Sequence, residues 1–338
     1  MSGTPRVSVC VANYNGAAMI AGCLDSVLTQ KGDFEVEILV HDDASSDASV
    51  EIISLAYPVV RMIRSADNVG FCIANNRMVA AALGEYVLLL NNDAELLPDA
   101  LHHLLAAAEA APSPVLLSLP QYDYDSGALI DRGCLLDPFY NPVPNLDPER
   151  REVAMAIGAC LWLPRNLWNE LGGFPEWFGS IGEDLYLCCR ARLVGYPVRV
   201  LDVSGYSHRV GASFGGGKVR DGRLASTFRR RALSERNKTY VMALTCPALF
   251  MPVILPMHIL MLFCEGVLLS LFKRRTAYLT EIYLPVFVAI YRRKSSLWDL
   301  RTAIHQHGQV ASTDFFSVFD WIPYKLRMLF KHGLPRLI

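Results

Sequence analysis

The stretch at residues 85–95 constrains the fold of this chain more than any other. It begins with five bulky apolar residues at 86–90 and ends in Asn91, Asn92 and Asp93. An apolar run of this length, bounded by polar residues, is typical of a strand buried on both faces of a parallel sheet. Ligands of open α/β sheets bind beyond the carboxyl ends of the strands, so Asp93 is predicted to lie at a ligand site. A strand followed by a plain Asn/Asp turn would show the same pattern.

Predicted strands and helices alternate as far as residue 203. Apolar runs rich in β-branched residues are followed by short polar turns and then by segments with helical spacing of apolar residues. Such alternation predicts an α/β domain with a parallel, doubly wound sheet. The predicted strands are 6–12, 35–40, 59–63, 86–90, 115–119 and 198–203, and the predicted helices are 17–30, 72–82, 98–110 and 184–193. Residues 121–151 show no period and are interpreted as an insertion or an irregular hairpin.

Charge is distributed unevenly along the chain. The 338 residues are 52% hydrophobic and 19% charged, and the net charge is −1. Residues 273–338 hold eleven Lys/Arg and four Asp/Glu, whereas residues 1–272 hold 21 Lys/Arg and 29 Asp/Glu. An acidic first part with a basic, apolar tail favours a soluble domain that is delivered to an anionic membrane surface. The charge and the Gly and Pro content exclude a polytopic membrane protein.

The nine cysteines are scattered and form neither CxxC nor zinc-type spacing, so most are expected to be small buried apolar residues. No signal peptide precedes the first predicted strand, and the catalytic part is therefore expected in the cytoplasm.

Residues 241–272 differ from the rest of the chain. They are apolar enough to span a bilayer, but Pro247, Pro252 and Pro256 interrupt them. A kinked segment that lies in the membrane plane or re-enters is therefore expected instead of a straight spanning helix. Basic clusters follow at 273–275 and 292–294, and together with the tail they predict helices that lie at the membrane interface. The alternative is a helical subdomain that packs on the sheet.

Polar clusters follow several predicted strands and open a later helix. Their acidic and amide side chains suit a metal-bound diphosphate together with hydroxyl-rich groups such as ribose and sugar. Neither GxGxxG after the first strand nor GxxxxGK[ST] occurs, which disfavours hydride transfer and P-loop chemistry. The residues in these clusters are Asn13, Asn15, Asp42, Asp43, Asp47, Asp93, Glu183, Asp184 and His208.

Seven short strings occur in an order that resembles family 2 glycosyltransferases of the GT-A fold. They are VSVCVANYNG, HDDASSDAS, NVGFCIANN, LLLNNDAEL, GACLWLPRNLWNELGGF, GEDLYLCCRARLVGY and SHRVGAS, and the match covers about residues 5–240. The pattern is most similar to rhamnosyltransferase-like enzymes of bacterial O-antigen and cell-wall polysaccharide assembly. The resemblance implies a GT-A-type, mostly parallel nucleotide-sugar-binding sheet with helices on both faces. It also implies a catalytic domain at 1–235, followed by membrane-associated helices at 236–338.

The resemblance implies a role for each matching residue. Asp93 would bind Mg²⁺ or Mn²⁺, and His208 would ligate the metal or contact the diphosphate. Asp184, after Glu183 at a helix start, would be the catalytic base. The residues implied to hold the nucleotide sugar are Ala12, Asn13, Asn15, Asp42, Asn68, Gly70 and Asn92, with Ser45 and Asp47 shaping a turn. A helix start that favours acids would also explain Glu183 and Asp184, and a structural loop role would explain His208.

This sequence departs from the family pattern in three places. The metal-binding element is reduced to Asn91-Asn92-Asp93, which leaves one carboxylate and puts metal dependence in question. Tyr186 stands where the family often has a further acid after Glu183-Asp184. No QxxRW follows, so transfer of a single sugar is favoured over processive synthesis.

The resulting hypothesis is an inverting, non-processive transferase at the cytoplasmic face of the inner membrane. It would move one sugar, with dTDP-rhamnose as the candidate donor, onto a polyprenyl-diphosphate-linked glycan, and no nucleic-acid partner is expected. The alternatives are a UDP-hexose or galactosyltransferase on the same scaffold and a non-catalytic membrane scaffold. In the Gly-rich segment 211–222, Lys218 and Arg220 would form a lid over the diphosphate or a plain solvated loop.

Overall fold

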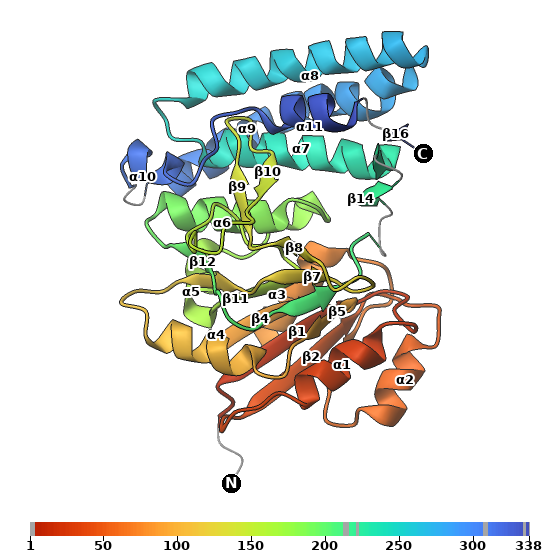
Figure 1. Cartoon of the computed structure of the whole chain (residues 1–338), viewed down its shortest axis with the longest axis vertical. Coiled ribbons are helices and arrows are strands. Elements are labelled where there is room, and N and C mark those ends of the chain that lie inside the picture. Colours follow the sequence, from red (N-terminus) through yellow and green to blue (C-terminus); the bar gives the residue numbers. More distant parts are fainter. Residues whose placement is uncertain (1–3, 212–215, 221–222, 307–309, 334–335, 338) are drawn as a thin grey trace. The chain divides into compact units, whose positions relative to one another are not determined.

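The computed structural model describes residues 4–211, 216–220, 223–306, 310–333 and 336–337 (Figure 1). The chain divides into two compact units. The first unit comprises Met1–Cys134, Pro144–Ala191 and Tyr196–Val210, and the second comprises Leu135–Val143, Arg192–Gly195 and Gly211–Ile338.

The first unit is built on a seven-stranded sheet with the strand order β12-β6-β11-β4-β1-β2-β3. β1 pairs in parallel with β2 and β4, and β2 pairs in parallel with β3. β11 runs antiparallel to both of its neighbours, so the sheet is mostly rather than wholly parallel. The strands are β1 (Val7–Asn13), β2 (Val36–Asp42), β3 (Arg61–Arg64), β4 (Tyr86–Asn91), β6 (Leu116–Ser118), β11 (Cys160–Pro164) and β12 (Val198–Val200).

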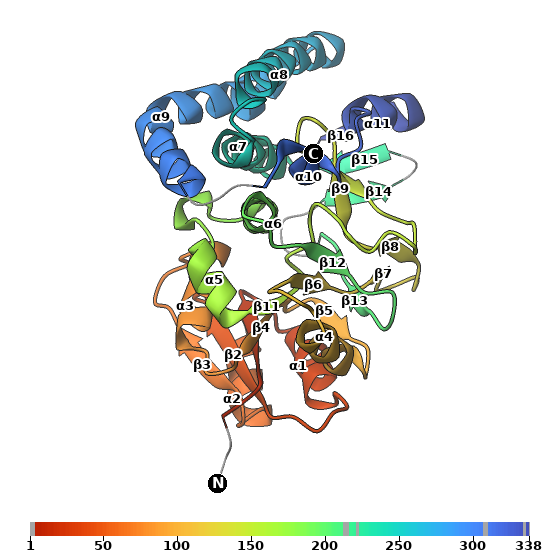
Figure 2. The same ribbon diagram turned by 90° about the vertical axis from the view of Figure 1, so that its left-hand side faces the viewer.

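Helices cover both faces of this sheet because the central strands are apolar on both sides. One face packs its alternate residues, such as Val9 and Leu88, against α1 (Ile20–Leu28) and α4 (Ala100–Glu109). The helix α3 (Phe71–Ala81) contacts β1 and β2 from the opposite side (Figure 2). The unit also contains α2 (Ser49–Ala56), α5 (Arg165–Leu171), the short 3₁₀ helix η1 (Glu176–Phe178) and α6 (Glu183–Leu193).

A smaller sheet with the order β5-β13-β7-β8 continues from the end of β4. It contains β5 (Ala94–Leu96), β7 (Gln121–Asp123), β8 (Leu129–Asp131) and β13 (Tyr206–His208). β7 and β8 form an antiparallel hairpin, as one of the two sequence interpretations of this aperiodic stretch expected. The stretch continues through β9 (Cys134–Leu136) and β10 (Pro142–Pro144).

The second unit is mainly helical. Its helices are α7 (Phe228–Thr245), α8 (Met251–Lys273), the π-helix η2 (Tyr278–Tyr283), α9 (Leu284–His305), α10 (Ser312–Phe316) and α11 (Tyr324–His332). The strands β14 (Gly216–Arg220), β15 (Arg223–Ser226) and β16 (Arg336–Leu337) form a small sheet. An apolar cluster joins α8 to η2 and α9 through Leu262, Leu269, Ile282, Tyr283 and Val286.

The expected interruption of residues 241–272 lies at Pro247, between the end of α7 at Thr245 and the start of α8 at Met251, and the later prolines do not end α8. Pro247 lies before the helix, and Pro252 occupies its first turn, where a backbone N–H has no partner within the helix. Pro256 is the one proline inside the helix. α8 is therefore continuous, and within the described residues it is the one helix long and apolar enough to cross a membrane.

Candidate functional site

A hydrogen-bond network joins the carboxyl ends of β1, β2 and β4. The Asn13 amide donates to Asp42 Oδ1 over 3.0 Å and to Ser49 Oγ over 3.0 Å. The Asn92 amide donates in turn to Asn13 Oδ1 over 3.0 Å. All of these side chains are buried, and Asn13 is completely inaccessible to solvent. The structure therefore brings together three of the residues implied to bind a nucleotide sugar.

The turn after β1 is fixed to the turn after β2. The Asn15 N–H donates to Ser45 Oγ over 2.9 Å, and Asn15 Oδ1 accepts the N–H of Ser46 over 2.8 Å. The Ala17 N–H donates to Asp47 Oδ2 over 2.8 Å. These bonds hold the two loops against each other, as the proposed turn-shaping role of Ser45 and Asp47 requires. Ala12 lies at the end of β1, in register with His41 and Asn91.

Asp43 holds the loop that precedes α3. Its two carboxylate oxygens accept the N–H groups of Val69 over 2.7 Å and Gly70 over 2.9 Å. Gly70 has φ of 90°, which an L side chain rarely adopts. Asn68, just before this pair, is exposed and offers its side chain to solvent. Sequence reasoning included Asp43 in an acidic cluster but missed this role, because the loop that Asp43 holds lies far along the chain from it.

Asp93 and His208 meet where β4 runs into β5. β13 pairs with β5 and places His208 opposite Ala94, and the Arg209 N–H donates to the Asp93 carbonyl over 3.0 Å. As a result Asp93 Oδ1 lies 3.1 Å from His208 Nε2, and both side chains are nearly inaccessible. Among the described residues, Asp93 Oδ1 and His208 Nδ1 have no hydrogen-bond partner of good geometry. Asp93 and His208, two predicted site residues that are far apart in the sequence, are therefore adjacent in the structure.

Asp131, which no sequence pattern singled out, is a buried carboxyl group in the same small sheet. Burial raises the pKa of Asp131 to about 7, although the Gly133 N–H and the charge of His208 act in the opposite direction. The Tyr206 hydroxyl nearby donates to Gln121 Oε1 over 2.7 Å. Burial raises the pKa of Tyr206 as well, and the negative charges of Asp131 and Asp184 raise it further. The charge of Asp184 therefore acts on the same buried region.

Glu183 and Asp184 form the first turn of α6, and both are buried. Asp184 Oδ2 accepts the N–H of Gly158 over 2.9 Å, and Oδ1 accepts the N–H of Leu185 over 2.7 Å. The next residue along from Gly158 is Ala159, whose carbonyl accepts the N–H of Asn91 over 3.0 Å. Asp184 is therefore attached, through this short segment, to the strand end that carries Asp93.

The loop before α6 is strained. Ile181 has φ of 70°, an unfavourable conformation for a β-branched residue that costs about 1–3 kcal/mol. Gly179, two residues earlier, accepts the N–H of Cys72 on its carbonyl over 3.1 Å and so connects this loop to the start of α3. Such strain is found mainly at functional sites, where the surrounding contacts hold it in place.

Two glycines leave room for the site side chains. A Cβ on Gly16 would lie 2.3 Å from Asn13 Oδ1 and 2.3 Å from Asn92 Nδ2. A Cβ on Gly158 would lie 3.3 Å from the Asp184 Cβ and 3.4 Å from its Oδ2. Sequence reasoning missed both positions, because their importance depends on neighbours that are distant in the chain.

The chemistry of Asp93 and His208 fits a divalent cation. A buried carboxylate oxygen that lacks a hydrogen-bond donor faces an imidazole nitrogen, and both atoms are common metal ligands. In the described part of the chain, no group of three or more His, Cys, Asp or Glu side chains is arranged to hold a metal ion. Asp93 and His208 would then be two of the ligands, and donor phosphates and water would supply others, as is usual for Mg²⁺.

Some predicted elements are not part of this geometry. Lys218 and Arg220 belong to β14, but their side chains lie outside the described residues, as do residues 212–215 and 221–222 of the Gly-rich segment. The assignments of Glu183 and Asp184 to catalysis, and of the nucleotide and metal ligands, stay predictions.

Comparisons with known proteins identify similar sequences. Residues 8–171 match the family model of Glycosyl transferase family 2. The succinoglycan biosynthesis protein ExoO of Rhizobium meliloti is 35% identical over 112 residues, which are 33% of this chain and 32% of that protein. An N-acetylglucosaminyl-diphospho-decaprenol L-rhamnosyltransferase of Mycobacterium tuberculosis is 28% identical over 192 residues, which are 48% of this chain and 62% of that protein. The chain thus spans from about a third to under two thirds of the length of these curated relatives.

Solved structures show the same fold. The mannosyltransferase PcManGT from Pyrobaculum calidifontis, in complex with GDP-Man and Mn²⁺, aligns with a TM-score of 0.52 at 20% sequence identity, and the alignment covers 88% of each chain. These findings confirm the family resemblance and the mostly parallel α/β fold class expected from the sequence.

Proposed function

We propose that this chain, which carries a glycosyltransferase family 2 domain, moves one sugar from a nucleoside-diphosphate sugar to a hydroxyl group of a lipid-linked glycan. The proposal specifies a single displacement with inversion at the anomeric carbon, and dTDP-rhamnose as the donor to test first. The observation that carries it is the pairing of Asp93 with His208 at the end of β4, with Asp184 attached to the same strand end through Gly158.

The donor would lie across the ends of β1, β2 and β4. Asn13, Asp42 and Asn92 form a rigid, hydrogen-bonded base there, and Asp43 fixes the loop that carries Asn68 and Gly70. Amide and carboxylate groups suit the hydroxyl groups of ribose and the edge of a nucleobase. Since these groups are already fixed by one another, little side-chain entropy would be lost when the donor binds.

Asp93 and His208 would hold the divalent cation and through it the donor diphosphate. A bound Mg²⁺ or Mn²⁺ stabilises the negative charge that develops on a departing nucleoside diphosphate. The structure of PcManGT contains GDP-Man and Mn²⁺, which supports a divalent cation beside a nucleotide sugar in the proposal.

Asp184 would accept the proton of the acceptor hydroxyl as that oxygen attacks. A base must reach the hydroxyl with a carboxylate oxygen of fixed direction. The N–H groups of Gly158 and Leu185 fix both carboxylate oxygens of Asp184 at the start of α6. Glu183 precedes it in the same first turn and adds negative charge beside the positive end of the helix dipole.

The acceptor is proposed to be a polyprenyl-diphosphate-linked glycan at the cytoplasmic face of the inner membrane. The name of the Mycobacterium tuberculosis relative includes a diphospho-decaprenol group, which supports a lipid-linked acceptor. The excess of seven positive charges in residues 273–338 and the exposed apolar residues of α8 support a membrane surface as the place of reaction.

The test is release of nucleoside diphosphate from a panel of dTDP-, UDP- and GDP-sugars, with and without a polyprenyl-diphosphate-linked acceptor. Asp184→Asn is compared with the native chain because it keeps the shape and the hydrogen bond from Gly158 but removes the basic carboxylate. We expect acceptor-dependent release from one donor and a loss of at least about a hundredfold in Asp184→Asn.

Three results would change the proposal. Equal release by Asp184→Asn and the native chain would remove Asp184 as the base. A preference for a UDP-hexose would select the alternative donor. No release with any pair of donor and acceptor would favour a scaffold that keeps the fold without catalysis.

A further inference from the structure

The long apolar helix α8 of the second unit has two unlike faces. Its buried face contains Ile254, His258, Leu262 and Leu269, which recur at intervals of four and seven residues. Its open face is exposed and contains Val253, Met257, Leu260, Cys264, Leu268 and Leu271, which recur at intervals of three or four residues. Such spacing places each set along one side of the helix. We call the second set the open face.

Polar contacts on the buried side tie α8 to its neighbours along its length. His258 Nε2 lies 2.9 Å from Thr239 Oγ1 of α7. Glu265, in the middle of α8, accepts from Arg231 of α7 over 2.8 Å and from Lys325 of α11 over 2.6 Å. The same two basic side chains also contact Glu235, which is almost completely buried.

This charged network disfavours a helix that crosses a bilayer. A spanning α8 would carry Glu265 into the hydrocarbon region, and it would either take Arg231 and Lys325 along or leave buried charges unpaired. Both outcomes are costly, because charged groups in hydrocarbon need partners and polar surroundings. The length and composition of α8 alone would permit a span, but its charged contacts favour a position at the membrane surface.

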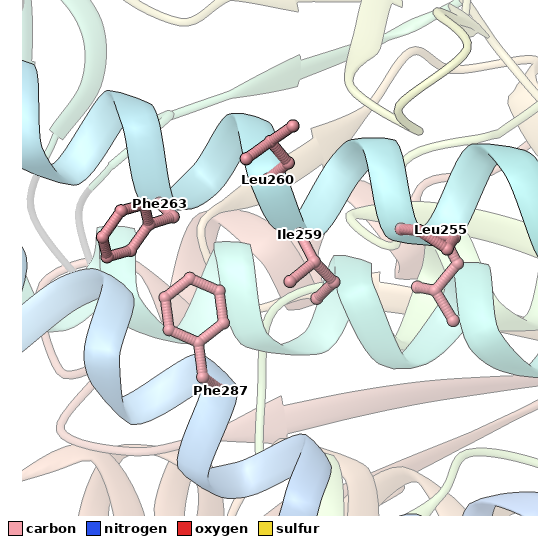
Figure 3. Close-up of a pocket in the computed structure, with 6 residues that line it drawn as sticks. Leu255, Ile259, Leu260, Phe263 and Phe287 are labelled. Carbon is pink, nitrogen blue, oxygen red and sulfur yellow. The ribbon is translucent and has the colours of Figure 1, made fainter.

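A groove beside the open face adds more apolar surface. Ile259 and Phe263 of α8 lie opposite Phe287 of α9, with Leu255 farther along α8 (Figure 3), and the groove has a volume of about 570 Å³. Pro256 and Leu260 complete the lining, and every described residue that lines the groove is apolar. Leu260 belongs to both the groove and the open face, which makes the two surfaces continuous.

Basic residues lie at one end of this apolar surface. Lys273, Arg274 and Arg275 follow directly on the exposed Leu271 and Phe272 at the end of α8, and all three are exposed. Anionic lipid headgroups would attract this cluster of three positive charges.

We propose that α8 lies in the plane of an anionic membrane surface, with its open face and the adjoining groove among the lipid hydrocarbon chains and residues 273–275 at the headgroups. This inference rests on the proposed function for its membrane setting, and it specifies how the second unit binds the membrane.

The test uses spin-label depth measurements on the full chain bound to vesicles of phosphatidylglycerol and phosphatidylcholine. Cys264 is the natural attachment point, because it is exposed and the other eight cysteines are buried. Further labels are placed singly at Val253, Leu260, Leu268 and Leu271 in a Cys264→Ala background. In-plane binding predicts a similar depth of about 5–10 Å at every site.

Two depth profiles would overturn the inference. A maximum near Leu260 and Cys264 with shallow values at both ends would indicate a spanning helix. Labels that report no lipid contact while the chain forms dimers would show that a second copy covers the open face.

A second measurement does not depend on labels. Leu260→Asp is expected to weaken vesicle binding at least about tenfold, because it places a charge in the inserted face. The matched control is Leu55→Asp, since Leu55 is also an exposed leucine, with 77% exposure, but lies on α2 of the first unit. Equal binding by both variants would refute the inference. Release of nucleoside diphosphate is measured separately, so a chain that binds in plane without turnover would refute the proposed function alone.

Discussion

Replacing Gly16 with Ala is expected to disrupt the candidate donor site by displacing the side chains of Asn13 and Asn92. The new methyl group would lie 2.3 Å from both Asn13 Oδ1 and Asn92 Nδ2, the two atoms of the hydrogen bond that joins β1 to β4. Carbon makes ordinary contacts with such atoms at about 3.5 Å, so both amides must move by about 1 Å. The backbone at Gly16 does not have a positive φ, so alanine can adopt it and the clash is the main effect.

The expected cost has two parts. Overpacking in a closely packed region costs about 1–3 kcal/mol. Breaking the buried bond between the two amides adds about 1 kcal/mol. We therefore expect Gly16→Ala to lower the free energy of unfolding by about 2–4 kcal/mol. If the displaced amides also contact the donor, the affinity for nucleoside diphosphate should fall at least about tenfold.

Gly22→Ala is the matched control. Its Cβ would also approach an oxygen at 2.3 Å, but that oxygen belongs to the flexible, partly exposed side chain of Glu95, which can turn away. Because Gly22 lies inside α1, alanine should stabilise the helix by about 0.5–1 kcal/mol. Denaturant unfolding and calorimetric titration with nucleoside diphosphates measure both effects. Native stability and affinity in Gly16→Ala would refute the reasoning.

Three further predictions concern Gly158, Asp131 and Asp93. Gly158→Ala should lower kcat about tenfold with little change in the donor KM, because its Cβ presses on Asp184; an unchanged kcat in steady-state assays would argue against this role. Asp131 has a pKa of about 7, above its ordinary value of 3.8, so the folded state holds its proton more tightly and loses stability as pH rises from about 4 to 7. Asp131→Asn should remove this loss, up to about 4 kcal/mol in unfolding experiments at pH 8 compared with pH 4, and an unaltered pH dependence would contradict it. A chelator should stop nucleoside diphosphate release, and Asp93→Asn should weaken Mn²⁺ binding to the nucleotide complex at least about tenfold by paramagnetic resonance; equal binding would exclude Asp93 as a ligand.

Local sequence patterns were sufficient to predict most of the first unit. The apolar runs of β1, β2 and β4 and the helical spacing of α1, α3 and α4 each lie within one short segment, so their periods can be read directly. The direction of β11 could not be read in this way. An apolar run is buried equally well in either direction, and only its neighbours decide how it pairs.

The candidate site, like the fold, was predicted in part by the sequence and decided in part by the tertiary structure. The sequence alone determined which residue types follow the strands, and the family resemblance selected Asp93, His208 and Asp184 among them. The tertiary structure decided that Asp93 and His208 lie 3.1 Å apart, because β13 pairs with β5, and that Gly158 holds Asp184. It also decided that α8 keeps a charged contact at Glu265 on one side and an open apolar face on the other. Contacts between segments far apart in the chain depend on packing and register, which no local pattern of residues specifies.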